Sequence, residues 1–275
     1  MDASGLEPIE QTALLTEYAR ALDSRAARPI LGDAHAGATV GRIDYDFAGL
    51  GATPSVVALV ALRAKMLDER IRGFVAEHHD AVVVDLGAGV SSAVFRVDPP
   101  PGVDWFSVDL PRMITLRESL LPPRDRTRSV AASLLEPGWI ENIPAVRPTM
   151  LFADGLFAFL EEPQVIGLLR RVTEHFGTGV IAFNDYGPVG RMNQLMGRLT
   201  TSSKASSPHR QWNFPGFKDA RRPEQWNANL TLVEEASAMH RPEAELFPRG
   251  LRLGARLAHR IPAIARKARI LQYRF

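Results

Sequence analysis

Apolar residues along this chain follow two different spacings, and each spacing predicts a different element. Between residues 55 and 78 apolar side chains recur every three to four positions, which is typical of a helix with one buried face. The next apolar run, Val82–Val84, is unbroken and β-branched, as in a strand of a parallel sheet that is covered on both faces. We therefore expect a helix that leads directly into the first strand of a sheet.

The alternation of strands and helices continues along the chain. Further strand-like runs occupy residues 104–110, 126–133, 148–155 and 178–185, and the stretches between most of them are long enough for helices. Two later runs, at residues 229–237 and 269–275, are also predicted strands. This pattern indicates a doubly wound α/β fold, in which a mostly parallel sheet has helices on both faces. The two late strands can form an antiparallel pair at one edge, which gives seven strands in a single domain spanning residues 1–275.

Two segments lie outside the alternation. Residues 1–52 precede the sheet and contain one expected helix, over residues 12–22, so they form an N-terminal helical extension. Residues 187–226 are rich in Gly, Pro, Ser and basic side chains, and a segment of that length within a compact domain is usually a lid or a substrate-binding insertion. We expect both segments to close over the carboxyl ends of the strands.

Composition narrows the class of protein. The chain has 275 residues, 45% of them hydrophobic, which is enough for a sizeable core. Its 33 Lys and Arg and 31 Asp and Glu leave a formal charge of +2, so the overall charge requires neither nucleic acid nor an anionic membrane as a partner. The absence of cysteine excludes disulfides, thiolate nucleophiles and cysteine zinc sites, and no His, Asp and Glu cluster has the spacing of metal ligands. Without a signal-peptide pattern or a run of ~20 apolar residues, we expect a cytoplasmic protein.

Polar and glycine residues follow the ends of the predicted strands, where ligands bind in an open parallel sheet. The first strand ends in Asp85, and Gly87 and Gly89 permit a tight turn and the close approach of a ligand. Ser92 stands where a dinucleotide fingerprint has its third glycine, which argues against a bound pyrophosphate. Asp109, 22 residues after Gly87, is suited to accept both hydroxyls of an adenosine ribose, although an aspartate after a strand can instead cap the next helix. The third and fourth strands end at Ser133-Leu134 and Asp154-Gly155.

The order of several segments along the chain resembles a known family. The segments are "ALRAKMLDERIRGF", "VVVDLGAGVSSAVFRVD", "WFSVDLP", "LLPP", "SLLEPGWIE", "LFADGLFAFLEEPQV" and the terminal "RILQYRF". Together they resemble the leucine carboxyl methyltransferase and polyketide (tetracenomycin-type) O-methyltransferase family, from about Leu14 through Phe275. The resemblance implies a class I, Rossmann-like methyltransferase of secondary metabolism that uses S-adenosylmethionine.

The resemblance also implies which residues hold the cofactor. Arg63 would pair with its methionine carboxylate, for which a bidentate guanidinium is well suited. Asp109 would bind the ribose hydroxyls, and Asp154 would approach the cofactor amine. The other implied cofactor contacts are Arg25 at the carboxylate, Asp85, Gly87, Ala88 and Gly89 at the glycine turn, Leu110 after Asp109, and Ser133 and Leu134 beside the adenine.

The chain departs from the family pattern at three places. Asp154 stands where the family usually has Glu in an E-G-x-x-x-Y-L pattern, and Phe159 replaces the Tyr. Ser91-Ser92 replaces the usual Asp-Thr. The changes at Asp154 and Phe159 leave open a protein that binds S-adenosylmethionine and has lost catalysis.

The identity of the methyl acceptor depends on whether a general base exists. A carboxylate acceptor is already ionised at neutral pH, whereas a phenol benefits from a base. Tyr186 and His209 are the candidates for a base, with His35 more remote in the extension. The aromatic residues Trp212, Phe214 and Phe217, with Tyr186, His209 and Arg210, could line an apolar acceptor pocket, although the aromatics could equally anchor the insertion to the core. Since no candidate is a convincing base, we expect a small-molecule acceptor methylated on a carboxylate rather than a phenol.

The end of the chain suggests a second class of function. Arg249–Phe275 carries eight Lys and Arg and no acid, interleaved with Leu and Ile, which could form a surface for nucleic acid or a membrane. In the family this part resembles a helix followed by the last strand, whose arginines would face solvent. We therefore expect neither nucleic acid nor a membrane as partner.

Overall fold

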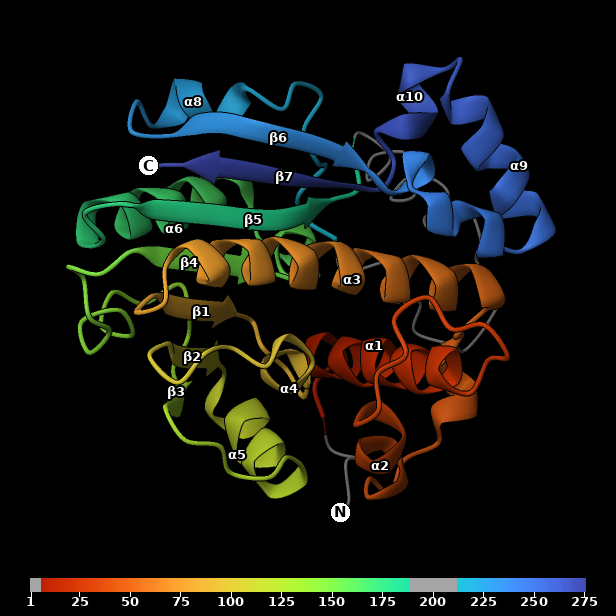
Figure 1. Ribbon diagram of the computed structural model, residues 1–275, viewed down its shortest axis with the longest axis horizontal. Coiled ribbons are helices and arrows are strands. Elements are labelled where there is room, and N and C mark those ends of the chain that lie inside the picture. Colours follow the sequence, from red (N-terminus) through yellow and green to blue (C-terminus); the bar gives the residue numbers. More distant parts are fainter. Residues whose placement is uncertain (1–5, 188–211) are drawn as a thin grey trace.

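The computed structural model describes residues 6–187 and 212–275, and its centre is one seven-stranded sheet (Figure 1). The strands are β1 (Val82–Leu86), β2 (Asp104–Asp109), β3 (Thr127–Ala131), β4 (Thr149–Ala153), β5 (Gly179–Asp185), β6 (Thr231–Ser237) and β7 (Arg269–Arg274). Their order is β3-β2-β1-β4-β5-β7-β6. The first five are parallel, and β7 pairs antiparallel with both β5 and β6. The predicted α/β fold and its antiparallel edge are confirmed.

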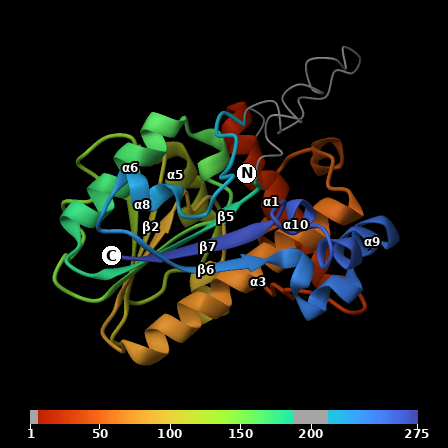
Figure 2. The same cartoon turned by 90° about the horizontal axis from the view of Figure 1, so that it is seen from above.

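Successive side chains of the central strands point to opposite faces of the sheet, and each face buries its own apolar cluster. Val83 packs in a cluster with helix α3 (Pro54–Glu77), whereas Val82 and Val84 pack in a cluster with helix α6 (Glu162–His175). Figure 2 shows these two helices on opposite faces of the sheet. All five residues of β1 are buried, because both of its faces are covered, as its unbroken apolar run predicts.

Helix α3 is the helix expected at residues 55–78, and its ends follow from local chemistry. The Thr53 hydroxyl caps the start by accepting a hydrogen bond from the Val56 amide, and Pro54 occupies the first turn, where its missing N–H costs nothing. His78 leaves the helical conformation at the other end, just before β1. The long helix crosses the sheet and brings Arg63, in its middle, to the carboxyl ends of the strands.

The N-terminal extension forms α1 (Pro8–Ser24), α2 (Ala36–Gly41) and the 3₁₀ helix η1 (Phe47–Leu50). Figure 1 shows α1 beside the carboxyl ends of β1 and β4, where it packs on α3. A capping box between Glu7 and Glu10 starts α1 at Pro8, four residues earlier than the sequence pattern indicates. At its other end the carboxylate of Asp23 accepts backbone hydrogen bonds from three successive residues, 30–32, which fixes the chain as it leaves the helix.

A buried ion cluster attaches this extension to the sheet. Asp33 accepts hydrogen bonds from the Ser92 hydroxyl and from Arg96, and Arg96 makes a second, bidentate pair with Asp68 of α3. All four side chains are buried or nearly so. Ser92, the position that lacks the third glycine of a dinucleotide fingerprint, therefore holds the extension in place.

The remaining helices complete the two layers. They are α4 (Ala93–Val97), α5 (Pro111–Leu120), η2 (Phe157–Phe159), α8 (Arg222–Trp226), η4 (Ala238–His240), η5 (Pro242–Leu246), α9 (Arg249–Ala258) and α10 (Pro262–Ala265). No helix in the described ranges is both long and apolar enough to cross a membrane. The lid expected at residues 187–226 falls mostly on residues 188–211, outside the described residues, and stays a prediction.

Candidate active site

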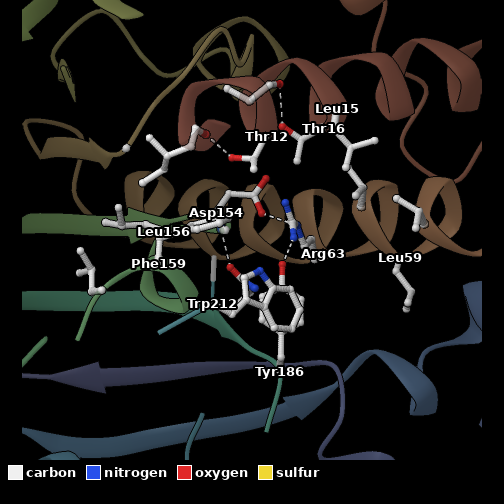
Figure 3. A pocket seen from close by; sticks show the side chains of 18 of the residues that line it. Thr12, Leu15, Thr16, Leu59, Arg63, Asp154, Leu156, Phe159, Tyr186 and Trp212 are labelled. Atoms are coloured by element: carbon white, nitrogen blue, oxygen red, sulfur yellow. Dashed lines mark hydrogen bonds and ion pairs between the residues drawn. The ribbon is translucent and has the colours of Figure 1, made fainter. Parts of the chain in front are cut away.

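A cavity of about 770 Å³ lies at the carboxyl ends of the parallel strands, where the order of the sheet reverses between β1 and β4. Its walls come from α1, η1 and α3, from the turns after β1 to β5, and from the start of β7. Most of the predicted cofactor residues line it, namely Arg63, Gly87, Asp109, Leu110, Ser133, Leu134 and Asp154. Tyr186 and Trp212, two of the predicted substrate contacts, line it as well (Figure 3).

Two arginines and an aspartate meet on the wall nearest the glycine turn. The Asp154 carboxylate pairs with Nε of Arg63 at 2.6 Å through one oxygen and with Arg20 of α1 at 2.9 Å through the other. Arg20 also pairs with the buried Glu17 at 2.9 Å. Burial by itself would raise the pKa of Asp154, but the two guanidinium groups outweigh it and hold that pKa below its ordinary value. Asp154 is therefore ionised at neutral pH, and Glu17, Arg20, Arg63 and Asp154 form what we call the Asp154 ion cluster.

The Asp154 ion cluster has hydrogen-bonding capacity left over. Nη2 of Arg63 and Nε of Arg20 are buried and make no hydrogen bond to any described residue. Buried donors without a partner are costly, because they have lost water and gained nothing in return. Both belong to cations that share Asp154, so a carboxylate from a ligand bound next to Asp154 would satisfy them.

Tyr186, directly after β5, lies against this cluster. Its hydroxyl accepts a hydrogen bond from Arg63, and its ring stacks on Trp212 with centroids 4.3 Å apart (Figure 3). Burial raises the pKa of Tyr186 above its ordinary value, so the side chain remains a phenol at neutral pH. Tyr186 can therefore position a ligand, but it has no tendency to act as a base.

The glycine turn after β1 has the geometry that the sequence predicts. Gly87 and Gly89 have φ of 71° and 51°, a region that side chains disfavour. The Asp109 carboxylate accepts hydrogen bonds from the amides of Gly89 at 2.6 Å and Leu110 at 2.7 Å, which ties the ends of β1 and β2 together. Burial raises the pKa of Asp109, although these two hydrogen bonds oppose the shift. Asp109 thus caps the backbone amides of Gly89 and Leu110. It also lines the cavity, where a residue that binds a ribose is expected to lie.

Three predicted residues lie behind or beside the main cavity. Asp85, Ala88 and Gly89 line a small cleft that opens next to Gly87 and the Asp154 ion cluster. Asp85 is only 2% exposed, and burial raises its pKa from the ordinary 3.8 to about 7. The three residues therefore belong to the glycine turn and its strand but do not line the main cavity.

Other predicted residues lie away from the cavity. Arg25, expected at the cofactor carboxylate, is exposed at the end of α1, whereas Arg20 of that helix pairs with Asp154. Phe214 and Phe217 are buried in the apolar cluster on the α6 face, so they anchor the returning chain to the core. His35 packs on Phe95 with ring centroids 4.8 Å apart and does not line the cavity. His209 and Arg210 lie outside the described residues.

Two further expectations concern metals and the basic end of the chain. Within residues 6–187 and 212–275, no group of three His, Asp or Glu side chains is arranged to hold a metal ion. The prediction that the C-terminal arginines face solvent is wrong for Arg269, which is 1% exposed and pairs with Asp185 at 2.8 Å. Part of the basic charge in this segment therefore neutralises an internal acid next to the cavity.

Sequence reasoning missed several cavity residues. Arg20 could have been found, because it lies three positions after Glu17 on the same face of the expected helix. Thr12 and Thr16 of α1 also line the cavity and extend that face. Lys267 and Ala268, just before β7, carry no local signal of their role.

Comparisons with known proteins agree with this site. The profile of the leucine carboxyl methyltransferase family matches residues 10–173. The tetracenomycin polyketide synthesis O-methyltransferase TcmP of Streptomyces glaucescens is 42% identical over 179 residues, which cover 65% of this chain and 66% of that protein. The S-adenosyl-L-methionine-dependent methyltransferase dpfgK of Gibberella zeae is 30% identical over 182 residues and 61% of each chain. The matches thus span just under two thirds of these relatives.

A solved structure supports the fold independently. A protein from Thermobifida fusca, 17% identical, superposes with a TM-score of 0.55 over 93% of both chains. The family profile covers more than half of the present sequence and includes α3, the glycine turn, Asp109 and Asp154. These relatives are named as methyltransferases, and the second as dependent on S-adenosyl-L-methionine. The predicted resemblance is confirmed: the chain belongs to the leucine carboxyl methyltransferase family.

Proposed function

We propose that the chain is an S-adenosylmethionine-dependent O-methyltransferase whose acceptor is a small molecule, with a carboxylate favoured over a phenol. The observation that carries the proposal is the Asp154 ion cluster. Arg63 and Asp154 of this cluster line the cavity, Arg20 lines the adjacent small cleft, and both arginines have unsatisfied donors. Those donors suit the carboxylate of an amino acid, and Asp154 beside them suits its ammonium group. Few other small ligands combine an amino acid with a ribose, for which Asp109 is suitably placed.

The cavity residues fit the parts of this cofactor in order. Arg63, Arg20 and Asp154 would hold its amino-acid end, and Asp109 would accept hydrogen bonds from the two ribose hydroxyls. The predicted adenine contacts, Ser133 and Leu134, line the same cavity beyond Asp109, which leaves the adenine an apolar surface to lie on. Gly87 lies between these regions, and its missing side chain lets the cofactor come close to the backbone. A Cβ at this position would already come within 3.2 Å of the Leu156 side chain.

The bound cofactor supplies an electrophilic methyl group on a sulfonium, and the protein's contribution is placement. Apolar walls from α1 and α3 exclude water from the reacting groups, and Tyr186 and Trp212 form a flat surface against which an acceptor can lie. Tyr186 keeps its proton, so the described residues that line the cavity offer no evident base. A carboxylate needs none, and this is why we favour it over a phenol.

Calorimetry with S-adenosylhomocysteine tests the cofactor assignment. Replacing Asp109 with Ala removes two charge-assisted hydrogen bonds to the ribose and should weaken binding by roughly 1.5 to 3 kcal/mol. Asp44→Ala, at an exposed position away from the cavity, is the matched control and should change nothing. Binding of NAD in place of S-adenosylhomocysteine, or equal affinity in the Asp109 variant, would contradict the assignment.

A second experiment tests the acceptor. Aromatic and polyketide acids are compared with matched phenols by release of S-adenosylhomocysteine at saturating cofactor. Transfer to an acid should stay nearly constant from about pH 6 to 8, because a carboxylate has finished ionising below that range. Tyr186→Phe and His209→Ala should lower the rate without changing the shape of that profile. A limb that rises through about pH 6.5 and vanishes in the His209 variant would instead show a phenol activated by histidine.

A further inference from the structure

Most of the charged side chains that line the cavity have an ion-pair or hydrogen-bond partner among the described residues, and one does not. Glu10, Arg63, Asp109, Asp154, Asp185, Lys267 and Arg269 line it. Six of these seven already have a partner within the protein. Glu10 accepts a hydrogen bond from the Glu7 amide. The other five make the ion pairs and hydrogen bonds described above, namely Arg63, Asp109, Asp154, Asp185 and Arg269. Lys267 is the exception, because no carboxylate in residues 6–187 or 212–275 pairs with it. Its charge is therefore available to a ligand.

The surroundings explain why Lys267 has no partner of its own. Glu235, on the neighbouring strand β6, already pairs with Arg269 and lies 3.9 Å from Arg266. The backbone of Lys267 is held between α10 and β7, where its amide donates to the Ile264 carbonyl at 3.1 Å. The ammonium group thus extends from a fixed backbone, and its neighbours of opposite charge are occupied.

Lys267 stands on the wall that also carries Tyr186. The next residue after Tyr186 is Gly187, and a Cβ there would overlap the carbonyl of Arg266, so the two backbones are in direct contact. Arg63 reaches Tyr186 from the opposite side, from α3 (Figure 3). The part of the cavity around Tyr186 therefore has two committed cations, Arg63 and Arg269, and one uncommitted cation, Lys267.

Apart from Asn184 and the paired Asp185 and Arg269, the rest of this part of the cavity is apolar. We call it the acceptor compartment, and define it by Tyr186, Trp212, Lys267 and apolar side chains of α3, η4, β7 and the residue before β7 that line the same cavity. Those apolar side chains are Val56, Leu59, Val60, Ala238, Ala268 and Ile270. A single uncommitted cation beside an apolar wall favours a ligand with an apolar body and one negative group, and it disfavours a cationic ligand.

We propose that Lys267 binds an anionic group of the methyl acceptor, so that the acceptor compartment selects apolar, anionic small molecules. The inference rests on the proposed function and deepens it by assigning a residue and a charge class to the acceptor. Lys267 is exposed at the mouth of the cavity, so its role is to hold and orient the acceptor while the apolar wall takes up the body. Lys267 is a specificity-determining residue, and it takes no part in the transfer itself.

A matched pair of fluorescent probes tests the proposal without knowledge of the natural acceptor. 8-Anilinonaphthalene-1-sulfonate has an apolar aromatic body with one negative charge, and N-phenyl-1-naphthylamine has nearly the same body without the charge. Both are titrated into the full chain with saturating S-adenosylhomocysteine. In Lys267→Gln the Kd of the sulfonate should rise about five- to tenfold, and that of the neutral probe should change less than twofold.

Three control variants make the result specific. Lys218→Gln removes an exposed lysine outside the cavity and should leave both constants unchanged. Arg256→Gln tests whether the sulfonate binds the basic surface of α9 instead. Lys267→Arg restores the charge and should recover most of the sulfonate affinity.

Other outcomes overturn the proposal. Equal loss of both probes in Lys267→Gln, no loss of the sulfonate, or no binding of the sulfonate to the unmodified chain would each refute it. If S-adenosylhomocysteine does not bind, the proposed function fails. The probe titrations are then run without it and still decide whether Lys267 selects an anion.

Discussion

Asp85 provides a strict test of the electrostatics behind the glycine turn. It is 2% exposed, its Oδ2 makes no hydrogen bond to any described residue, and burial raises its pKa from 3.8 to about 7. Arg117 opposes the shift, whereas the charges of Asp154 and Asp109 add to it. We expect Asp85→Asn, which keeps the shape and removes the ionisation, to become progressively more stable than the unmodified protein as the pH rises.

The sign and size follow from linkage between proton binding and folding. Between the two pKa values the folded protein holds a proton on Asp85 more tightly than the unfolded chain does, so the protonated carboxyl stabilises the fold at low pH. That contribution is lost as the pH rises towards 7. With 1.36 kcal/mol for each unit of pKa shift, the full difference is about 4 kcal/mol, of which about 2.7 kcal/mol is lost between pH 5 and 8.

Urea unfolding of both proteins at pH 5, 6.5 and 8 measures the effect. The free energy of unfolding of Asp85→Asn minus that of the unmodified protein should increase by about 2 to 3 kcal/mol from pH 5 to pH 8, at equal m-values. The subtraction removes the titration of groups that the two proteins share. Asp98→Asn, at an exposed surface pair with Arg124, is the control for the substitution itself. A difference that is constant with pH, or that falls, would refute the reasoning.

Two further variants test the packing around the site. Gly89→Ala places a side chain at φ 51° and 3.1 Å from α1, so it should lower the free energy of unfolding by about 1 kcal/mol and weaken S-adenosylhomocysteine in calorimetry. Gly73→Ala, in open space on α3, should instead stabilise by about 0.5 to 1 kcal/mol. Arg269→Met leaves Asp185 buried and unpaired, so it should cost about 3 to 5 kcal/mol in urea unfolding; Arg274→Met, on an exposed position of β7, should cost under 1 kcal/mol. A cost of the same size in the two arginine variants would contradict the buried pair.

The sequence predicts the sheet well because the signals for its strands are local. The unbroken apolar run at Val82–Val84 requires cover on both faces, and the structure supplies α3 and α6. The strand ends also converge as expected, since parallel strands bring residues such as Asp109 and Asp154 to one edge whatever the helices do.

Residues from outside the sheet are predicted less well, because their positions depend on how distant elements pack. Arg20 meets Asp154 across 134 positions of sequence, so this contact exists only once α1 is docked on the sheet. Likewise Phe214 has the composition of a pocket residue, and only its packing in the apolar cluster shows that it belongs to the core. Lys267 looks like one of many C-terminal cations until the partners of its neighbours are known.

The docking of α1 on the sheet and the binding of a ligand are linked equilibria. Arg20 on this helix shares Asp154 with Arg63, and Thr12 and Thr16 form the wall above them, so a ligand in the cavity contacts both the helix and the sheet. The free energy of binding therefore adds to the stability of the docked helix, and undocking α1 opens a route out of the cavity that requires no movement of a strand. Amide hydrogens of α1 should therefore exchange more slowly with ligand bound.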